Sequence, residues 1–234
     1  MTDGLLHGFR DARRILGASV AATIAAASWL LIAIAGALER PVIPALGSAR
    51  SEPSLIEAAT FGVVLPLASY ALCARIGGTR DDLLSAYWTR HGISRRLYTL
   101  GRIAFSGASG SLLMVMSAVL AFALSRAVFG AAAAGGALSL AALIAVAALG
   151  ALSYAACFAL AQLLGGGLGR ATFLVVDWLL GSGAGIAALP WPRSHLRSLL
   201  GGPGVAGMSP YQTALFLGCL ALTGALLCMR RVPP

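Results

Sequence analysis

The sequence contains no lysine: all 17 of its basic residues are arginine. A phosphate-binding loop of the GxxxxGK[ST] type needs a lysine, so the chain carries no such ATPase motif. A lysine Schiff base and a lysine general base are excluded for the same reason. We therefore expect that this chain is not an enzyme and that it holds no cofactor of its own.

Charged residues are also scarce, at 11% of the chain, where a soluble domain has roughly 25%. Hydrophobic residues make up 59%, and the mean hydropathy is +0.86. Such a composition is typical of a membrane protein. The net charge of +9 does not indicate nucleic-acid binding, because the arginines are spread over many loops. The four cysteines form no CxxC pair and fall in or at the ends of apolar segments, so we expect no metal site.

Six apolar segments are long enough to cross a hydrocarbon core, which takes ~20 mostly apolar residues. The sequence lacks the alternation of a membrane β-barrel, so the spans must be helices. We predict an all-α membrane protein with a single transmembrane domain, 1–234. Its six transmembrane helices are expected at 15–38, 55–74, 103–125, 137–164, 171–189 and 211–229.

The orientation follows from the arginines. Twelve of the 17 lie in segments on the side of the N-terminus, and five lie on the other side. The positive-inside rule therefore places both termini in the cytoplasm. Residues 1–14 have Leu5, Leu6 and Phe9 on one side and charged residues on the other. Two interpretations stay open for them: an amphipathic helix along the headgroups, or a solvated tail.

The segment 75–102 is the one long cytoplasmic loop, and 190–210 is the external loop before the last span. Within the first, Thr79 can cap a short helix that ends near Gly92. Its side chains suit either an interfacial helix or a docking helix for a soluble partner, and spacing alone does not separate the two.

A motif spans the same loop. Its parts are Gly78-Thr79, Leu83-Leu84, Gly92-Ile93-Ser94-Arg95-Arg96 and Gly101-Arg102. This stretch resembles the loop after the second of six spans in ABC-2-type exporter permeases. The amphipathic start and the external segment before the last span are also similar to that family.

The resemblance implies a permease subunit in a bacterial inner membrane. A separate ABC ATPase subunit would bind ATP and Mg²⁺ and dock on the loop through a coupling helix at 81–91. The candidate coupling residues that the resemblance implies are Arg80, Asp81, Asp82, Leu84, Tyr87, Trp88, Arg90 and His91. A second permease copy or homologue would complete the transporter, with membrane lipids around it and no nucleic acid. Two alternatives stay open: a membrane subunit that only anchors or assembles a complex, and a proton-coupled carrier that uses Asp177.

Asp177 is the acidic residue well inside a predicted span. Charges at membrane depth are costly and face a bundle interior or a wet cavity. Arg170, seven residues earlier on the same helix face, is its expected partner, and the spacing predicts that Asp177 lies toward the cytoplasmic side. Two roles stay open for Asp177: a place in the transport path or its gating, and a structural ion pair or hydrogen bond.

Overall fold

The structure is a computed structural model that describes residues 3–39, 55–77, 92, 94–129 and 139–232 of the 234-residue chain. These residues form helices and connecting turns, and none of them lies in a strand. The elements are α1 Asp3–Leu16, α2 Ala18–Glu39, α3 Leu55–Ala59, the π-helix η2 Thr60–Val64, α4 Leu65–Ile76, α7 Arg95–Phe129, α8 Leu140–Leu180, the 3₁₀ turn η4 Ile186–Ala188, α9 Pro192–Leu199, the 3₁₀ turn η5 Val205–Gly207 and α10 Pro210–Arg231.

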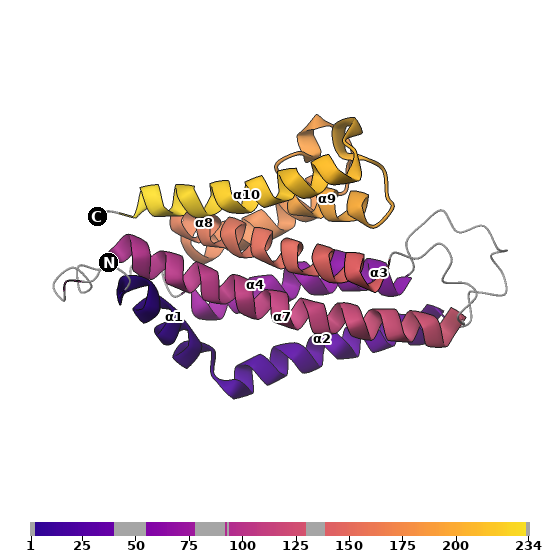
Figure 1. The fold of residues 1–234 in the computed structure, drawn as a ribbon, viewed down its shortest axis with the longest axis horizontal. Helices are drawn as coiled ribbons and strands as arrows, with labels where there is room; N and C mark the ends of the chain where they lie inside the picture. Colours follow the sequence, from indigo (N-terminus) through magenta and orange to yellow (C-terminus); the bar gives the residue numbers. More distant parts are fainter. Residues whose placement is uncertain (1–2, 40–54, 78–91, 93, 130–138, 233–234) are drawn as a thin grey trace.

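Five helical units of the described chain are long and apolar enough to cross a membrane. They are Ala18–Leu38, Leu55–Ile76, Arg95–Ala127, Leu140–Leu180 and Pro210–Arg231. All of them run along the long axis of the molecule (Figure 1). The described residues are therefore all-helical, as predicted, and five of their helical units have the length and apolar content of spans in a multi-pass membrane protein.

The 41-residue helix α8 reverses direction at Gly166. This residue has φ 62° and ψ −145°, a conformation open only to glycine, and flanking Gly165 and Gly167 loosen the turn further. The hydroxyl of Tyr154 lies 2.6 Å from the Asp177 carboxylate, whereas 23 residues of unbroken helix would separate them by about 35 Å. Thus α8 is a helical hairpin whose two halves meet at the glycines.

The predicted end of the fifth span is wrong. We expected this span at 171–189, but the helix ends at Leu180. Gly181, Gly183 and Gly185 follow in alternation with small residues. This glycine-rich stretch has a weak helix propensity and is apolar enough to extend a hydropathy window past the true end.

Helix α1 packs against the start of α7. At the closest approach, a Cβ added to Gly8 would lie 2.1 Å from the Tyr98 carbonyl oxygen, so only glycine fits. The residues of α1 that are buried are Gly4, Gly8, Ala12 and Leu16, a stripe of four-residue steps. The predicted apolar side therefore remains partly uncovered, with Leu6 48% and Phe9 39% exposed.

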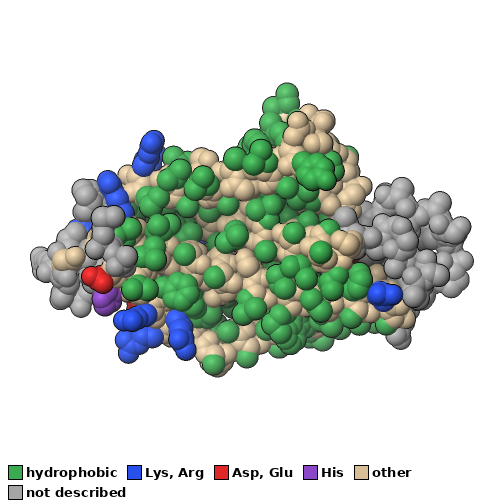
Figure 2. All heavy atoms as spheres, in the orientation of Figure 1, with side chains coloured by type: hydrophobic (Ala, Val, Ile, Leu, Met, Phe, Trp, Pro, Cys, Tyr) green, Lys and Arg blue, Asp and Glu red, His purple; other side chains and the backbone are tan. Residues whose placement is uncertain are grey.

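The flank of the molecule is apolar (Figure 2). We call the end that carries both ends of the described chain the terminal end, and the opposite end the α9 end (Figure 1). Arginines gather at the terminal end in the view of Figure 2. By their places on the helices, the arginines of this end are Arg10, Arg13, Arg14, Arg75, Arg95, Arg96, Arg102, Arg170, Arg230 and Arg231.

Candidate functional site

Asp177 lies at the centre of a buried polar cluster on the α9 end of the bundle. Its side chain is fully buried. The hydroxyl of Tyr154, on the first half of α8, donates to Oδ2 at 2.6 Å. The backbone N–H of Arg193, at the start of α9, donates to Oδ1 at 3.2 Å. Each carboxylate oxygen thus has a hydrogen bond within the protein, as a buried charge requires.

The expectation that Arg170 turns toward Asp177 is wrong. Nη1 of Arg170 donates to the Cys73 carbonyl on α4 at 3.0 Å. Because the helix ends at Leu180, Asp177 lies in its last turn, toward the α9 end rather than toward the Arg170 end. The two residues share one helix face, but other helices provide closer partners for both.

The side chain of Arg193 reaches the helix that contains Gly62. Nη1 of Arg193 donates to the Gly62 carbonyl at 2.6 Å. In an α-helix that carbonyl would accept from the N–H of residue 66, and Pro66 has none. The guanidinium also lies over the ring of Trp178, 4.9 Å from its centroid. Arg193 therefore connects α9 to two other elements at once.

His195 is buried two residues further along α9. Its Nε2 lies 2.8 Å from the Leu189 carbonyl, so Nε2 carries the proton and donates. Its ring stacks on Phe216 of α10 at 4.9 Å between centroids. Nδ1 is buried without a hydrogen-bond partner among the described residues. Burial lowers the pKa of His195 below its usual value near 6.5, although the bond to Leu189 acts in the opposite direction.

A second polar cluster surrounds the last turn of α4 at the terminal end. Besides Arg170, the buried Arg102 of α7 donates from Nη2 to the Ile76 carbonyl. Nη1 of Arg102 lies 3.3 Å from the hydroxyl of Tyr98, and that hydroxyl donates to Asp11 of α1. Two arginines thus bind the carbonyl end of α4, where the helix dipole favours cations. We call this group the Arg102–Arg170 cluster.

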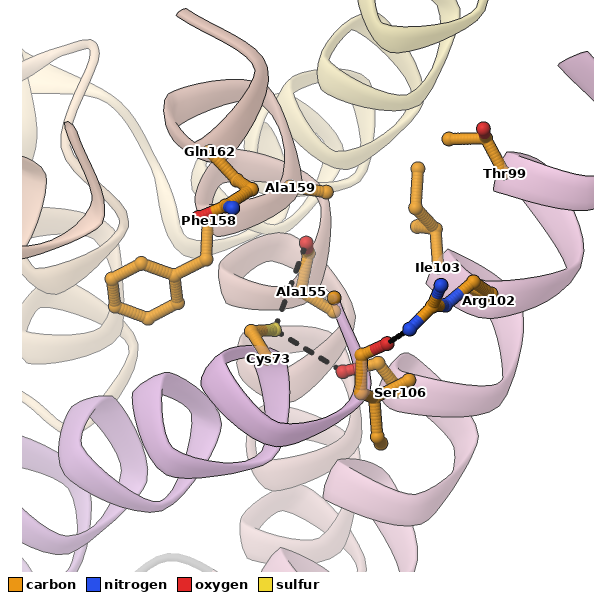
Figure 3. Close-up of a pocket in the computed structure, with 11 residues that line it drawn as sticks. Cys73, Thr99, Arg102, Ile103, Ser106, Ala155, Phe158, Ala159 and Gln162 are labelled. Atoms are coloured by element: carbon orange, nitrogen blue, oxygen red, sulfur yellow. Dashed lines mark hydrogen bonds between the residues drawn. The ribbon is translucent and has the colours of Figure 1, made fainter. Parts of the chain in front are cut away.

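A small cavity lies beside this cluster, between α4, α7 and α8 (Figure 3). The thiol of Cys73 lies 3.1 Å from the Ser106 hydroxyl at its wall, and Thr99 and Gln162 lie farther round it. The cavity measures about 30 Å³, which holds one or two water molecules. Sites for drug-sized ligands measure about 300–1,000 Å³, so this one is not a cargo pocket.

The predicted coupling residues, Arg80, Asp81, Asp82, Leu84, Tyr87, Trp88, Arg90 and His91, lie outside the described residues. The two helices that flank them end and begin in the described part, α4 at Ile76 and α7 at Arg95, both at the terminal end (Figure 1). The segment 190–210 contains the short helix α9, Pro192–Leu199.

Sequence reasoning missed the roles of Arg193 and Tyr154. Arg193 was part of a loop, and Tyr154 lay inside an uncharged span. One signal was available: a proline inside a span leaves the carbonyl four residues earlier without its donor. Pro66 thereby marks Gly62 as an acceptor for a side chain from elsewhere.

Within the described ranges there is no group of three or more histidine, cysteine or carboxylate side chains able to hold a metal ion. Comparison with protein-family models, curated proteins and solved structures finds no match to this chain.

Proposed function

We propose that this chain is the transmembrane permease subunit of an ATP-driven ABC-2-type exporter. A separate nucleotide-binding subunit would bind ATP and Mg²⁺, and a second permease chain would pair with this one. The proposal rests first on the loop motif between Gly78-Thr79 and Gly101-Arg102. The helix order around that loop supports it.

The helical hairpin supports six crossings rather than five. Its first half and its second half run in opposite directions, so we count them as two passes, of which the second, 167–180, is short. With the other four units this gives an even number of spans and both termini on one side. Because arginines gather at the terminal end, our proposal places that end in the cytoplasm. The membrane in the proposal is a bacterial inner membrane. Helix α1, with its uncovered Leu6 and Phe9, would lie along the headgroups there.

One observation supports the coupling role: the end of α4, where the predicted loop begins, is hydrogen-bonded to α7 and α8. The loop leaves α4 just after Ile76, whose carbonyl accepts from Arg102. Arg170 holds the carbonyl of Cys73 one turn earlier and belongs to the helical hairpin. A force on the loop would therefore reach α7 and α8 through buried hydrogen bonds rather than through a free linker.

We assign Asp177 a structural role in this scheme. Both of its oxygens accept hydrogen bonds from groups that hold α9 and α8 together. A proton-coupled carrier would need Asp177 to release and take up protons during each cycle. The present partners instead hold the carboxylate in one position.

The test is purification of the tagged chain from its native host in mild detergent, with identification of the co-purifying proteins. We expect a stoichiometric ATPase subunit, and its ATP hydrolysis should rise in the presence of this chain. Trp88→Ala should reduce its recovery severalfold. Tyr211→Ala is the matched control, because Tyr211 is 89% exposed at the α9 end and should not affect recovery.

The outcomes separate the candidate functions. If several mild detergents recover no ATPase, the exporter proposal fails. Recovery of another complex without ATPase would favour an anchoring subunit. Transport that stops with Asp177→Asn and does not depend on ATP would favour a proton-coupled carrier.

A further inference from the structure

We infer that Arg193 is a positioning residue that couples the helix unit α3–η2–α4 to α9. We call α3–η2–α4 the second helix unit. Pro66 leaves the Gly62 carbonyl without its helical donor. Proline at this position cannot donate to the Gly62 carbonyl, and the backbone just before it forms the π-helix Thr60–Val64. Such π-turns occur where a helix is locally strained or serves a function.

Arg193 donates to this carbonyl from outside the helix. Its guanidinium is always charged, and a charged donor at 2.6 Å makes a stronger bond than a neutral one. A Cβ on residue 62 would lie 3.6 Å from Nη2 of Arg193, an ordinary contact distance, so the bond to this carbonyl does not itself require glycine. The bond joins residues that are 131 positions apart in the chain.

Arg193 is also held to α8. Its backbone N–H donates to Asp177, and its guanidinium lies over Trp178. Arg193 is therefore the point at which the second helix unit, the helical hairpin and α9 meet. If the second unit shifts against α8, either α9 moves with it or the Gly62 bond breaks.

The consequence for transport rests on the proposed function. The other end of the same unit is held by Arg102 and Arg170, next to the predicted coupling loop. Arg193 would then pass a movement that begins at the loop on to α9, at the opposite end of the bundle. The coupling itself can be tested without an ATPase.

The test is hydrogen–deuterium exchange of the α9 amides in the purified full chain, for Arg193→Met, Pro66→Ala and the double variant. Arg193→Met leaves the Gly62 carbonyl without a donor, so we expect α9 amides to exchange about tenfold faster or more. Pro66→Ala restores an N–H to that carbonyl. In this background, the added effect of Arg193→Met should fall below about threefold.

Arg197→Met is the matched control on the same helix. Its side chain donates to the Ser182 carbonyl and not to the second helix unit, so its effect should be equal in both Pro66 backgrounds. If Arg193→Met does not fold alone, folding of the double variant with Pro66→Ala would show the same compensation, and failure of both variants to fold would overturn the inference.

An equal effect of the Arg193 substitution in both backgrounds would overturn the inference, since Arg193 would then act only through Asp177 and packing. No change in α9 exchange would overturn it as well. Neither result bears on whether an ATPase co-purifies, so this inference and the proposed function can fail separately.

Discussion

Arg170 donates from Nη1 to the backbone carbonyl of Cys73 at 3.0 Å. Arg170 lies four residues after the reversal at Gly166, and Cys73 lies in the last turn of α4. The bond joins the helical hairpin to the helix that leads into the loop. It also brings a cation to the negative end of a helix dipole in a buried setting, where both effects are strong.

Arg170→Met should therefore destabilise the protein by about 1.5–3 kcal/mol, the usual worth of a hydrogen bond from a charged group. Thermal unfolding of the purified chain in detergent measures this. The control is Arg126→Met, because Arg126 is exposed at the opposite end of α7 and should change stability by at most about 0.5 kcal/mol. Equal shifts for the two variants would contradict the structure.

Gly166→Ala should disrupt the helical hairpin, since the backbone there has φ 62° and ψ −145°. No atom would clash with the new Cβ, so the cost of about 1–3 kcal/mol is conformational. Gly165→Ala is the control. Its Cβ also meets nothing within 4 Å, and its φ is not in the left-handed region. Unfolding temperatures that fall equally for both would show that the reversal does not depend on Gly166.

Hydropathy predicted the helices well because membrane crossing depends on length and apolar content, which one sequence displays. The predicted spans 55–74 and 211–229 each lie within helices that the structure shows at 55–76 and 210–231. The hydrogen-bond partners of the buried charged side chains could not be predicted in this way. Asp177 and Arg170 share a helix face, but their actual partners come from α9 and α4, whose placement depends on the packing of the whole bundle.

Tyr154→Phe should leave Oδ2 of Asp177 without its hydroxyl donor while keeping the ring in place. A buried carboxylate oxygen that loses its partner costs about 1–3 kcal/mol, so the unfolding midpoint should fall. Tyr70→Phe is the control, because the Tyr70 ring packs against Phe158 in the same aromatic group and makes no contact with Asp177. If removal of either hydroxyl has the same effect, the bond to Asp177 contributes nothing to stability.

The buried His195 predicts a loss of stability in acid. Its pKa in the folded protein is lowered, so below about pH 6.5 the unfolded chain binds a proton that the folded chain does not. The contribution of His195 to stability is therefore complete above that pH. It is lost as the pH falls from there toward the lowered pKa, at up to about 1.4 kcal/mol per pH unit. His195→Phe keeps the stacking on Phe216 and cannot titrate, but it loses the bond to Leu189.

We expect wild type to be more stable than His195→Phe at pH 7.5, and the difference to shrink or reverse at pH 5.5. Unfolding temperatures of both proteins across this range measure it, and the difference between them cancels the other titrating groups. His7→Gln, which removes an exposed histidine of α1, is the matched control. A gap between wild type and His195→Phe that stays constant with pH would mean that folding does not suppress the protonation of His195, and that the Nδ1 atom is not excluded from water as the structure places it.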